Sequence, residues 1–219
     1  MKLKVCGMKY VENIQQVAEL QPDYLGFIFY EKSKRNFEGI IPDLPKGIKK
    51  AGVFVNEIPE IVVSLTEEYG LNMIQLHGDE SINYINKLKT LFEESIVEKS
   101  QKAKYKIPEI VKVFGVKNDF NFSVLKDYEK FVDYFLFDTK GKERGGNGFT
   151  FDWKVLENYN SSKPFFLSGG IGLEQVEDIQ NILKTDLPIY ALDVNSKFET
   201  TAGLKSVEKI EKFKKSLTV

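Results

Sequence analysis

Short runs of apolar residues recur along the whole chain, and turn or polar residues bound each run. The runs are nearly continuous rather than alternating, which is typical of strands buried on both faces of a sheet. We expect eight strands of this kind, and they cover residues 3–6, 24–30, 51–55, 73–77, 110–116, 134–138, 164–168 and 189–194.

Amphipathic segments separate these strands and predict helices. In the segment 59–69, for example, Ile61, Leu65 and Tyr69 follow one another at a spacing of four and share one helix face. The segment 37–50 is the weakest of the series, because its two prolines leave room for a turn or two at most. The expected helices cover residues 11–20, 59–69, 82–92, 122–131, 153–159, 173–183 and 207–217.

Alternating strands and helices imply right-handed βαβ units and a parallel sheet. Eight units in 219 residues average about 27 residues each, which suits an α/β fold of the (β/α)8 TIM-barrel type, with residues 1–219 as a single domain. The alternative is an open doubly wound sheet, which usually has fewer strands and a G-x-G-x-x-G turn after the first. The chain has CGMK at residues 6–9 in that place, so the pattern favours the barrel.

Charge and cysteine content narrow the possible functions. The chain has 31 Lys and Arg against 32 Asp and Glu, so no net field draws it to nucleic acid or to an anionic membrane. No apolar run approaches the ~20 residues that cross a bilayer, and no signal peptide is recognisable. The single cysteine excludes an internal disulfide and fits a reducing compartment. We therefore expect a cytoplasmic protein with no nucleic-acid or membrane partner.

Chemically versatile side chains gather at the ends of the expected strands. In a barrel of this kind the active site lies at the carboxyl ends of the strands. The sole cysteine, Cys6, the sole histidine, His77, and the aspartates Asp138 and Asp193 all occupy such ends. Polar residues scattered over a surface would not coincide in this way, so these four are candidates for an active site.

Cys6 and Asp138 form a candidate acid–base pair. They end the first and sixth strands, on opposite sides of a closed barrel, so they can face each other across a pocket. Asp138 follows an apolar stretch, where poor hydration favours the protonated carboxyl and suits a general acid. The alternatives are an inert buried thiol and a carboxylate that caps the next loop. One histidine and one cysteine do not make a usual zinc site, so we expect no metal.

Candidate anion-binding groups follow three of the strands. Gly169 and Gly170 follow the seventh strand, and the backbone N–H groups of glycines can approach an anion closely. Asn195 and Ser196 follow the eighth, and the loops after strands seven and eight form the phosphate site common in these barrels. Arg35, after the second strand, offers a planar fork for a carboxylate. The alternatives are a tight glycine turn and an ordinary exposed arginine.

Two loops and one histidine leave more than one interpretation open. His77 can hydrogen-bond a substrate or hold a loop in place. The glycine-rich, charged loop 140–148 indicates either a mobile flap over the pocket or a plain surface loop. The segment 93–106 is rich in Lys, Glu and Ser, so we expect an extended helix end or a surface excursion.

Taken in order, these motifs resemble the phosphoribosylanthranilate isomerases, the barrel enzymes of tryptophan biosynthesis. The resemblance covers essentially the whole chain. The cysteine motif, the histidine motif and the run from Asp138 to Trp153 are highly specific, whereas the glycine pair is shared by many phosphate-binding barrels. The matching motifs are KVCG at 4–7, GFIFY and SKR within 26–35, GVFVN at 52–56, QLHGDE at 75–80, FDTKGKERGGNGFTFDW at 137–153, LSGGIG at 167–172 and DVNSKFE at 193–199.

This resemblance implies an Amadori rearrangement of N-(5-phosphoribosyl)anthranilate to 1-(2-carboxyphenylamino)-1-deoxyribulose 5-phosphate, without metal or cofactor. Asp138 is then the general acid that opens the ribose ring, and Cys6 is the general base that removes the proton from C2. Arg35 binds the anthranilate carboxylate. The remaining substrate contacts come from His77 and Asp193, and the phosphate contacts from Gly169, Gly170, Asn195 and Ser196. Both monomers and homodimers occur on this fold.

Several positions depart from the pattern of the family, among them Phe198 and the run 202–205, which differ modestly, and two other functions compete with it. Lys34 replaces a common proline beside Arg35, and Lys197 replaces a common glycine after Ser196. The related aminoaldose isomerase of histidine biosynthesis uses an aspartate on strand one, where this chain has Cys6. A barrel that only binds a sugar phosphate has no need for both Cys6 and Asp138.

Overall fold

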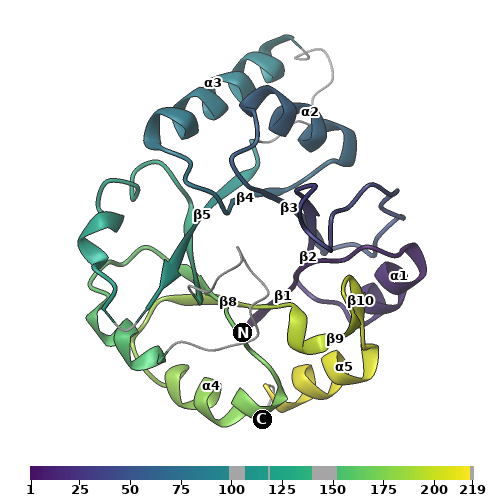
Figure 1. The fold of residues 1–219 in the computed structure, drawn as a ribbon, viewed down its shortest axis with the longest axis vertical. Helices are drawn as coiled ribbons and strands as arrows, with labels where there is room; N and C mark the ends of the chain where they lie inside the picture. Colours follow the sequence, from purple (N-terminus) through teal and green to yellow (C-terminus); the bar gives the residue numbers. More distant parts are fainter. Residues whose placement is uncertain (99–106, 118, 140–151, 218–219) are drawn as a thin grey trace.

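The computed structural model describes residues 1–98, 107–117, 119–139 and 152–217. Eight parallel strands form a closed barrel, as the hydrophobic pattern predicts (Figure 1). They are β1 (Lys2–Val5), β2 (Tyr24–Phe29), β3 (Lys49–Phe54), β4 (Met73–Leu76), β5 (Glu109–Val116), β6 (Tyr134–Thr139), β7 (Phe165–Leu167) and β8 (Ile189–Val194). Each pairs with its neighbours in sequence, and β8 pairs with β1 to close the barrel.

The helices lie outside this barrel (Figure 1). The α-helices are α1 (Val11–Glu19), α2 (Pro59–Tyr69), α3 (Ile82–Glu98), α4 (Val176–Ile182) and α5 (Val207–Ser216). In α2, Pro59 occupies the first turn, where its missing N–H costs nothing, and Gly70 ends the helix in the left-handed conformation. Helix α3 runs six residues beyond its expected end at residue 92, because the polar segment that follows continues the helix.

Two of the expected α-helices are wrong. Residues 122–131 and 153–159 form only short 3-10 turns, η1 (Phe122–Leu125) and η2 (Trp153–Asn158). The side chains of Asn121 and Asp152 cap these turns, and the aromatic and β-branched residues in both segments are weak helix formers. The helix expected at 173–183 is split into the 3-10 turn η3 (Leu173–Gln175) and α4. No helix forms within 37–50, where the prolines lie.

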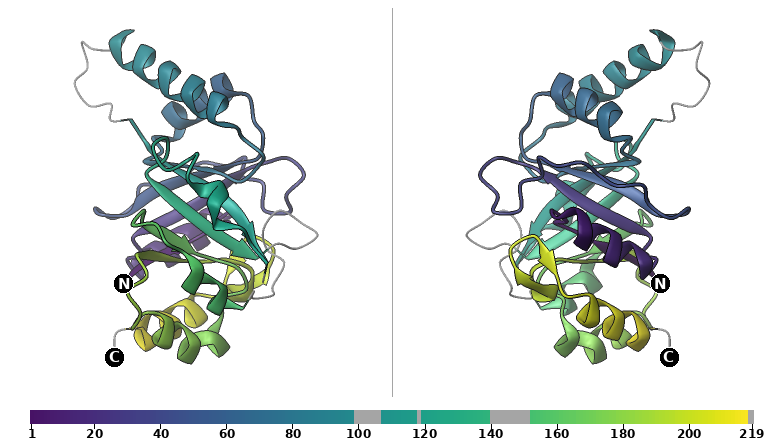
Figure 2. Two further views of the ribbon diagram at one scale, coloured as in Figure 1. Left: turned by 90° about the vertical axis from the view of Figure 1, so that its left-hand side faces the viewer. Right: turned by 90° about the vertical axis from the view of Figure 1, so that its right-hand side faces the viewer.

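A hairpin that the pattern did not predict follows β8. The 3-10 turn η4 (Ser196–Phe198) leads into β9 (Glu199–Thr201), which pairs in an antiparallel manner with β10 (Leu204–Lys205). Gly203 completes the turn with φ of +86°, a conformation that glycine adopts without strain. The two strands are too short and too polar to give a hydrophobic signal. The hairpin lies at the opposite end of the barrel from the amino terminus (Figure 2).

Apolar side chains fill the barrel on the amino-terminal side of the pocket described below. Register-paired residues point to the same side of a sheet, so Tyr24 points into the barrel together with its partner Lys4. The buried residues of this inner cluster are Tyr24, Ala51, Met73, Val111, Val113, Leu136, Phe166 and Ala191. A larger cluster packs the helices against the outer face of the strands. Within the described chain, no helix is long and apolar enough to cross a bilayer.

Candidate active site

A cavity of about 400 Å³ opens at the carboxyl ends of the strands. Its lining draws on loops that are far apart in the sequence, from Cys6 after β1 to Asn195 after β8. The nine candidate residues selected from the sequence all line it: Cys6, Arg35, His77, Asp138, Gly169, Gly170, Asp193, Asn195 and Ser196. The residues that the strand-end argument selected therefore come together in one cavity, whereas their assignment to an active site and their individual roles stay predictions.

Cys6 lies directly after β1, and its backbone N–H donates to the carbonyl of Val194 at 2.9 Å. Gly26 on β2 makes room for the thiol, since a Cβ at that position would lie 2.9 Å from Sγ. The residue is 4% exposed. Burial raises the pKa of the Cys6 thiol, and the nearby positive charge of Lys4 offsets part of that rise. The thiol form is therefore favoured until another positive charge approaches.

A buried ion pair lies beneath Cys6. Lys4 lies two residues before Cys6 on the strand, so both side chains point into the barrel. Its ammonium donates to Gln75 Oε1 at 2.7 Å and to Asp193 Oδ2 at 2.9 Å. Burial opposes the charge on Lys4, but the carboxylate of Asp193 raises the pKa of the ammonium above its usual value. Asp193 Oδ1 is buried without a hydrogen-bond partner among the described residues, so it can accept a bond from a ligand.

Asp138 and His77 meet on the other side of the cavity. His77 Nε2 lies 3.5 Å from Asp138 Oδ2, and His77 Nδ1 lies 3.3 Å from Gln75 Nε2. Because Gln75 accepts from Lys4 through its oxygen, its amide nitrogen donates to Nδ1, which places the imidazole proton on Nε2. A polar chain thus runs from Lys4 through Gln75 and His77 to Asp138. Cys6 follows β1 and Asp138 lies on β6. Only β7 and β8 lie between these strands on the shorter path around the barrel, so the expectation that the two residues lie on opposite sides is not exact.

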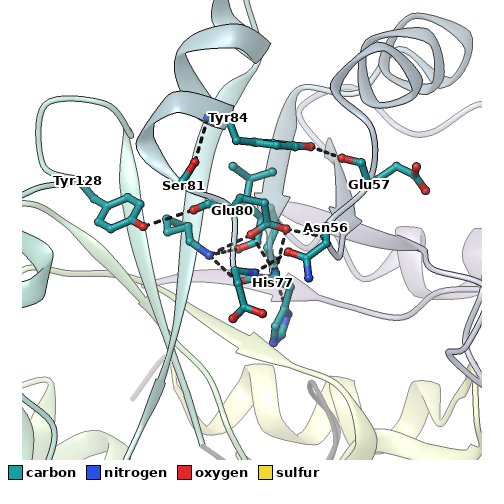
Figure 3. A network of polar contacts seen from close by, with 12 residues as sticks. Asn56, Glu57, His77, Glu80, Ser81, Tyr84 and Tyr128 are labelled. Atoms are coloured by element: carbon teal, nitrogen blue, oxygen red, sulfur yellow. Dashed lines mark hydrogen bonds and ion pairs between the residues drawn. The ribbon is translucent and has the colours of Figure 1, made fainter.

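The loop that carries His77 is braced from behind (Figure 3). Glu80 accepts hydrogen bonds from the backbone N–H groups of Asn56 and Gly78, each at 2.9 Å. Lys112 donates to the carbonyl of Gly78 at 2.7 Å and to Glu80 at 3.0 Å. Both charged side chains are almost fully buried and satisfy each other. This brace fixes the loop after β4 and therefore the position of His77.

Backbone conformation and limited space explain the glycine pair after β7 without any ligand. Gly169 and Gly170 have φ of +91° and +66°. A Cβ at residue 169 would lie 2.3 Å from Thr139 Oγ1 and 3.0 Å from Asp138 Oδ1. The tight-turn interpretation is thus sufficient to require glycine at 169, and it leaves the backbone open to the cavity. Lys197, which departs from the family pattern, donates to Glu174 at 2.8 Å in an exposed ion pair.

Arg35 does not stand alone at the rim of the cavity. Its Nε and Nη2 donate to the two carboxylate oxygens of Glu199 at 2.8 and 2.7 Å. Glu199 also accepts from Lys205 at 2.7 Å, and that lysine is completely buried. Neither Glu199 nor Lys205 was among the candidate residues, because neither of them follows an apolar strand directly. The loop 140–148, expected to be a flap or a surface loop, lies outside the described residues.

The sequence and the fold both match known proteins. The family model for N-(5'phosphoribosyl)anthranilate (PRA) isomerase matches residues 3–216. The N-(5'-phosphoribosyl)anthranilate isomerase of Parabacteroides distasonis is 39% identical over 220 residues, covering 97% of this chain and 91% of that protein. Monomers generated from the dimeric phosphoribosylanthranilate isomerase of Thermotoga maritima superimpose with a TM-score of 0.75 and 29% identity, covering 100% of this chain and 98% of that one.

A ligand-bound structure belongs to the same group. It is a phosphoribosyl anthranilate isomerase in complex with reduced 1-(o-carboxyphenylamino)-1-deoxyribulose 5-phosphate. The two structures superimpose with a TM-score of 0.76 and 27% identity, covering 100% of this chain and 98% of that one. Sequence, fold and cavity therefore all point to one family.

Proposed function

The chain belongs to the N-(5'-phosphoribosyl)anthranilate isomerase family, and from this premise we propose how its cavity performs the Amadori rearrangement of tryptophan synthesis. The reaction converts an aminoaldose into an aminoketose without a change in composition, so it requires protons to be moved and no group to be transferred. The observation that carries the assignment of roles is that Cys6 and Asp138 line one cavity from different strands. One group can therefore give a proton to the substrate while the other takes one away.

Asp138 starts the reaction as the general acid. Its protonated carboxyl donates to the ring oxygen of the ribose, the bond between that oxygen and C1 breaks, and the nitrogen lone pair forms a C1=N iminium. The hydrogen bond from the backbone N–H of Thr139 to Oδ1, at 2.8 Å, and the contact of Oδ2 with His77 hold the carboxyl in place. The positive charge of the iminium then lies in the same cavity as Cys6.

Cys6 completes the reaction as the general base. Burial keeps the free thiol protonated, but a neighbouring iminium favours the thiolate in addition to the charge of Lys4. The thiolate removes the proton from C2, and the electron pair forms a C1=C2 bond while the iminium nitrogen becomes neutral. The resulting enaminol then gains a proton at C1 and loses the one on its C2 hydroxyl, which gives the ketone.

The polar ends of the substrate match the remaining residues of the cavity. Arg35 binds the anthranilate carboxylate through its guanidinium. Asp193 accepts a hydrogen bond from a ribose hydroxyl through Oδ1, which has no partner among the described residues. His77 contacts the substrate beside Asp138. The phosphate is bound by Gly169, Gly170, Asn195 and Ser196, which all line the cavity.

The purified protein should convert freshly generated N-(5'-phosphoribosyl)anthranilate without added metal. The anthranilate-type fluorescence of the substrate should decay faster than in buffer, and in proportion to the protein concentration. An exposed variant far from the cavity, Lys215→Ala, is the matched control and should retain the full rate. Decay at the spontaneous rate in a folded sample would refute the assignment of activity.

The wider biology follows from the same premise. We propose a cytoplasmic enzyme with one catalytic domain over residues 1–219 that acts on its small-molecule substrate without a nucleic-acid or membrane partner. The free thiol of Cys6 suits a reducing compartment. For the assembly we propose a monomer or a homodimer, as in the Thermotoga maritima relative that occurs as a dimer and has been converted to monomers.

A further inference from the structure

The β9–β10 hairpin places two charged side chains behind the cavity that the reaction steps do not use. Glu199 Oε1 accepts hydrogen bonds from Arg35 Nε at 2.8 Å, from Lys205 Nζ at 2.7 Å and from the backbone N–H of Gly203 at 3.0 Å. Its Oε2 accepts from Arg35 Nη2 at 2.7 Å. The side chains of Glu199 and Lys205 are 6% and 0% exposed, so neither is a solvated surface charge.

Lys205 is held in place from two directions. Its backbone N–H donates to Asn13 Oδ1 at 2.7 Å, and its carbonyl accepts from Asn13 Nδ2 at 2.8 Å. Its ammonium donates to Asn195 Oδ1 at 2.6 Å as well as to Glu199. One buried lysine therefore contacts both the partner of Arg35 and a residue assigned to the phosphate.

These contacts fix the orientation of Arg35 and Asn195, the two side chains assigned to the anionic groups of the substrate. A lysine ammonium can only donate, so the amide of Asn195 must turn its oxygen toward Lys205, which leaves its NH2 group to donate to another acceptor. Glu199 binds Arg35 along the Nε–Nη2 edge, and this sets the plane of the guanidinium. Gly7 permits the approach of both, because a Cβ there would lie 2.7 Å from Asn195 Oδ1 and 2.8 Å from Arg35 Cδ.

The charges of this cluster also favour an anionic ligand. Arg35 and Lys205 carry two positive charges and Glu199 carries one negative charge, so the cluster has a net charge of +1 beside the cavity. Burial opposes the charge of Glu199, but its bonds from Arg35 and Lys205 keep the pKa of the carboxyl below its usual value. Loss of the lysine charge would make the cluster neutral, and loss of the glutamate charge would leave two cations with no anion between them.

We propose that Glu199 and Lys205 are positioning residues for the two anionic ends of the substrate. Glu199 orients Arg35 for the anthranilate carboxylate, and Lys205 orients the amide of Asn195 for the phosphate and supplies the positive charge of the cluster. The inference rests on the proposed function, because that function assigns Arg35 and Asn195 to these two groups. It adds the hairpin to the site as the element that couples carboxylate recognition to phosphate recognition.

Proton loss from Lys205 should make binding depend on pH. Burial and, to a smaller extent, the charge of Arg35 lower the pKa of Lys205 to about 8, against the opposing effects of Glu199 and Cys6. Among the described residues, these are the charged groups with the largest effect on it. The ammonium is the binding-competent form, so affinity for an anionic ligand should fall as pH rises through about 8. A Cys6→Ser background removes the thiol, which would otherwise add a negative charge when it ionises as the pH is raised.

The test is to measure the dissociation constant of the reduced product analogue, 1-(2-carboxyphenylamino)-1-deoxyribulose 5-phosphate with its ketone reduced, by calorimetry. Two matched ligands lack either the ring carboxylate or the phosphate. In the Cys6→Ser background at pH 7, Glu199→Gln should weaken binding of the full analogue by about tenfold and that of the decarboxylated ligand by less than twofold. Lys205→Met should weaken binding of the full analogue by about tenfold and that of the ligand without a phosphate by less than twofold. It should also abolish the fall in affinity near pH 8.

The outcomes separate this inference from the function on which it rests. If the wild-type protein does not bind the full analogue, the proposed function fails. If the wild type binds but each variant weakens all three ligands equally, the residues are merely structural and the positioning roles are wrong. Lys205→Arg, which retains the charge, should recover part of the affinity. Should Glu199→Gln not fold, the phosphate selectivity and the pH profile of Lys205→Met decide the inference alone.

Discussion

Replacing Cys6 with alanine should lower the turnover number at saturating substrate by at least about 100-fold, the usual effect of removing a general base. The variant keeps the cavity, and alanine fits the strand end beside Gly26 because it is smaller than cysteine. What it loses is the group that takes the proton from C2, after Asp138 has opened the ring. Turnover is measured by the decay of substrate fluorescence, with the enzyme concentration raised until the residual rate exceeds the spontaneous one.

Cys6→Ser is the control for shape. Its hydroxyl is close in size to the thiol but much harder to ionise, so it should lose turnover to a similar extent while it binds the reduced product analogue as the wild type does. The raised pKa of the Cys6 thiol adds a second expectation. The kcat of the wild type, measured at saturating substrate so that the fall in affinity near pH 8 does not affect it, should rise with pH as the thiolate forms, and this rise should be absent from the serine variant. Near wild-type turnover in Cys6→Ala would mean that another group is the base.

Asp138→Asn should lower turnover by at least about 100-fold as well, because an amide cannot protonate the ring oxygen. The substitution preserves the shape of the side chain, and the amide oxygen can still accept the hydrogen bond from the backbone N–H of Thr139. Loss of activity would therefore show that the variant cannot protonate the ring oxygen, rather than that it is misfolded. Far-ultraviolet circular dichroism and binding of the reduced analogue provide the control for folding.

His77→Gln separates the acid from its neighbour. The imidazole contacts Asp138 Oδ2 at 3.5 Å, so its removal should lower turnover by less than Asp138→Asn does. If Asp138→Asn turned over at near the wild-type rate, or if His77→Gln alone abolished turnover, the role of general acid would belong elsewhere in the cavity.

The strands of this barrel could be predicted from the sequence, because strands buried on both faces must be continuously apolar. The pattern placed all eight strands, and no strand end is in error by more than two residues. It was less informative for the connections, where a few capping and turn-forming residues decide between an α-helix and a 3-10 turn. The hairpin of β9 and β10 left no trace in the pattern, because its five strand residues contribute almost nothing to a hydrophobic run.

The residues that line the cavity at the strand ends could be predicted from the sequence, whereas the charged residues of the hairpin behind them could not. Polar residues at the ends of apolar strands, such as Cys6 and Asp138, are conspicuous because burial there needs a reason. Lys205 gives no such signal, since its burial depends on a hairpin that brings it against Asn195 and Glu199. Gln75 could have been recognised, because an amide within an apolar strand must find a partner in the barrel.

The central claim is that one cavity moves a proton from C2 and completes an aldose-to-ketose rearrangement. Carbon NMR of the product, made from substrate labelled with ¹³C at ribose C1 and C2, tests this most directly. The wild-type protein should convert C1 from a carbon with one hydrogen into one with two, and C2 into a ketone carbonyl. The double variant Cys6→Ala with Asp138→Asn should produce neither signal. Unchanged substrate, or hydrolysis to free anthranilate with the wild-type protein, would contradict the account.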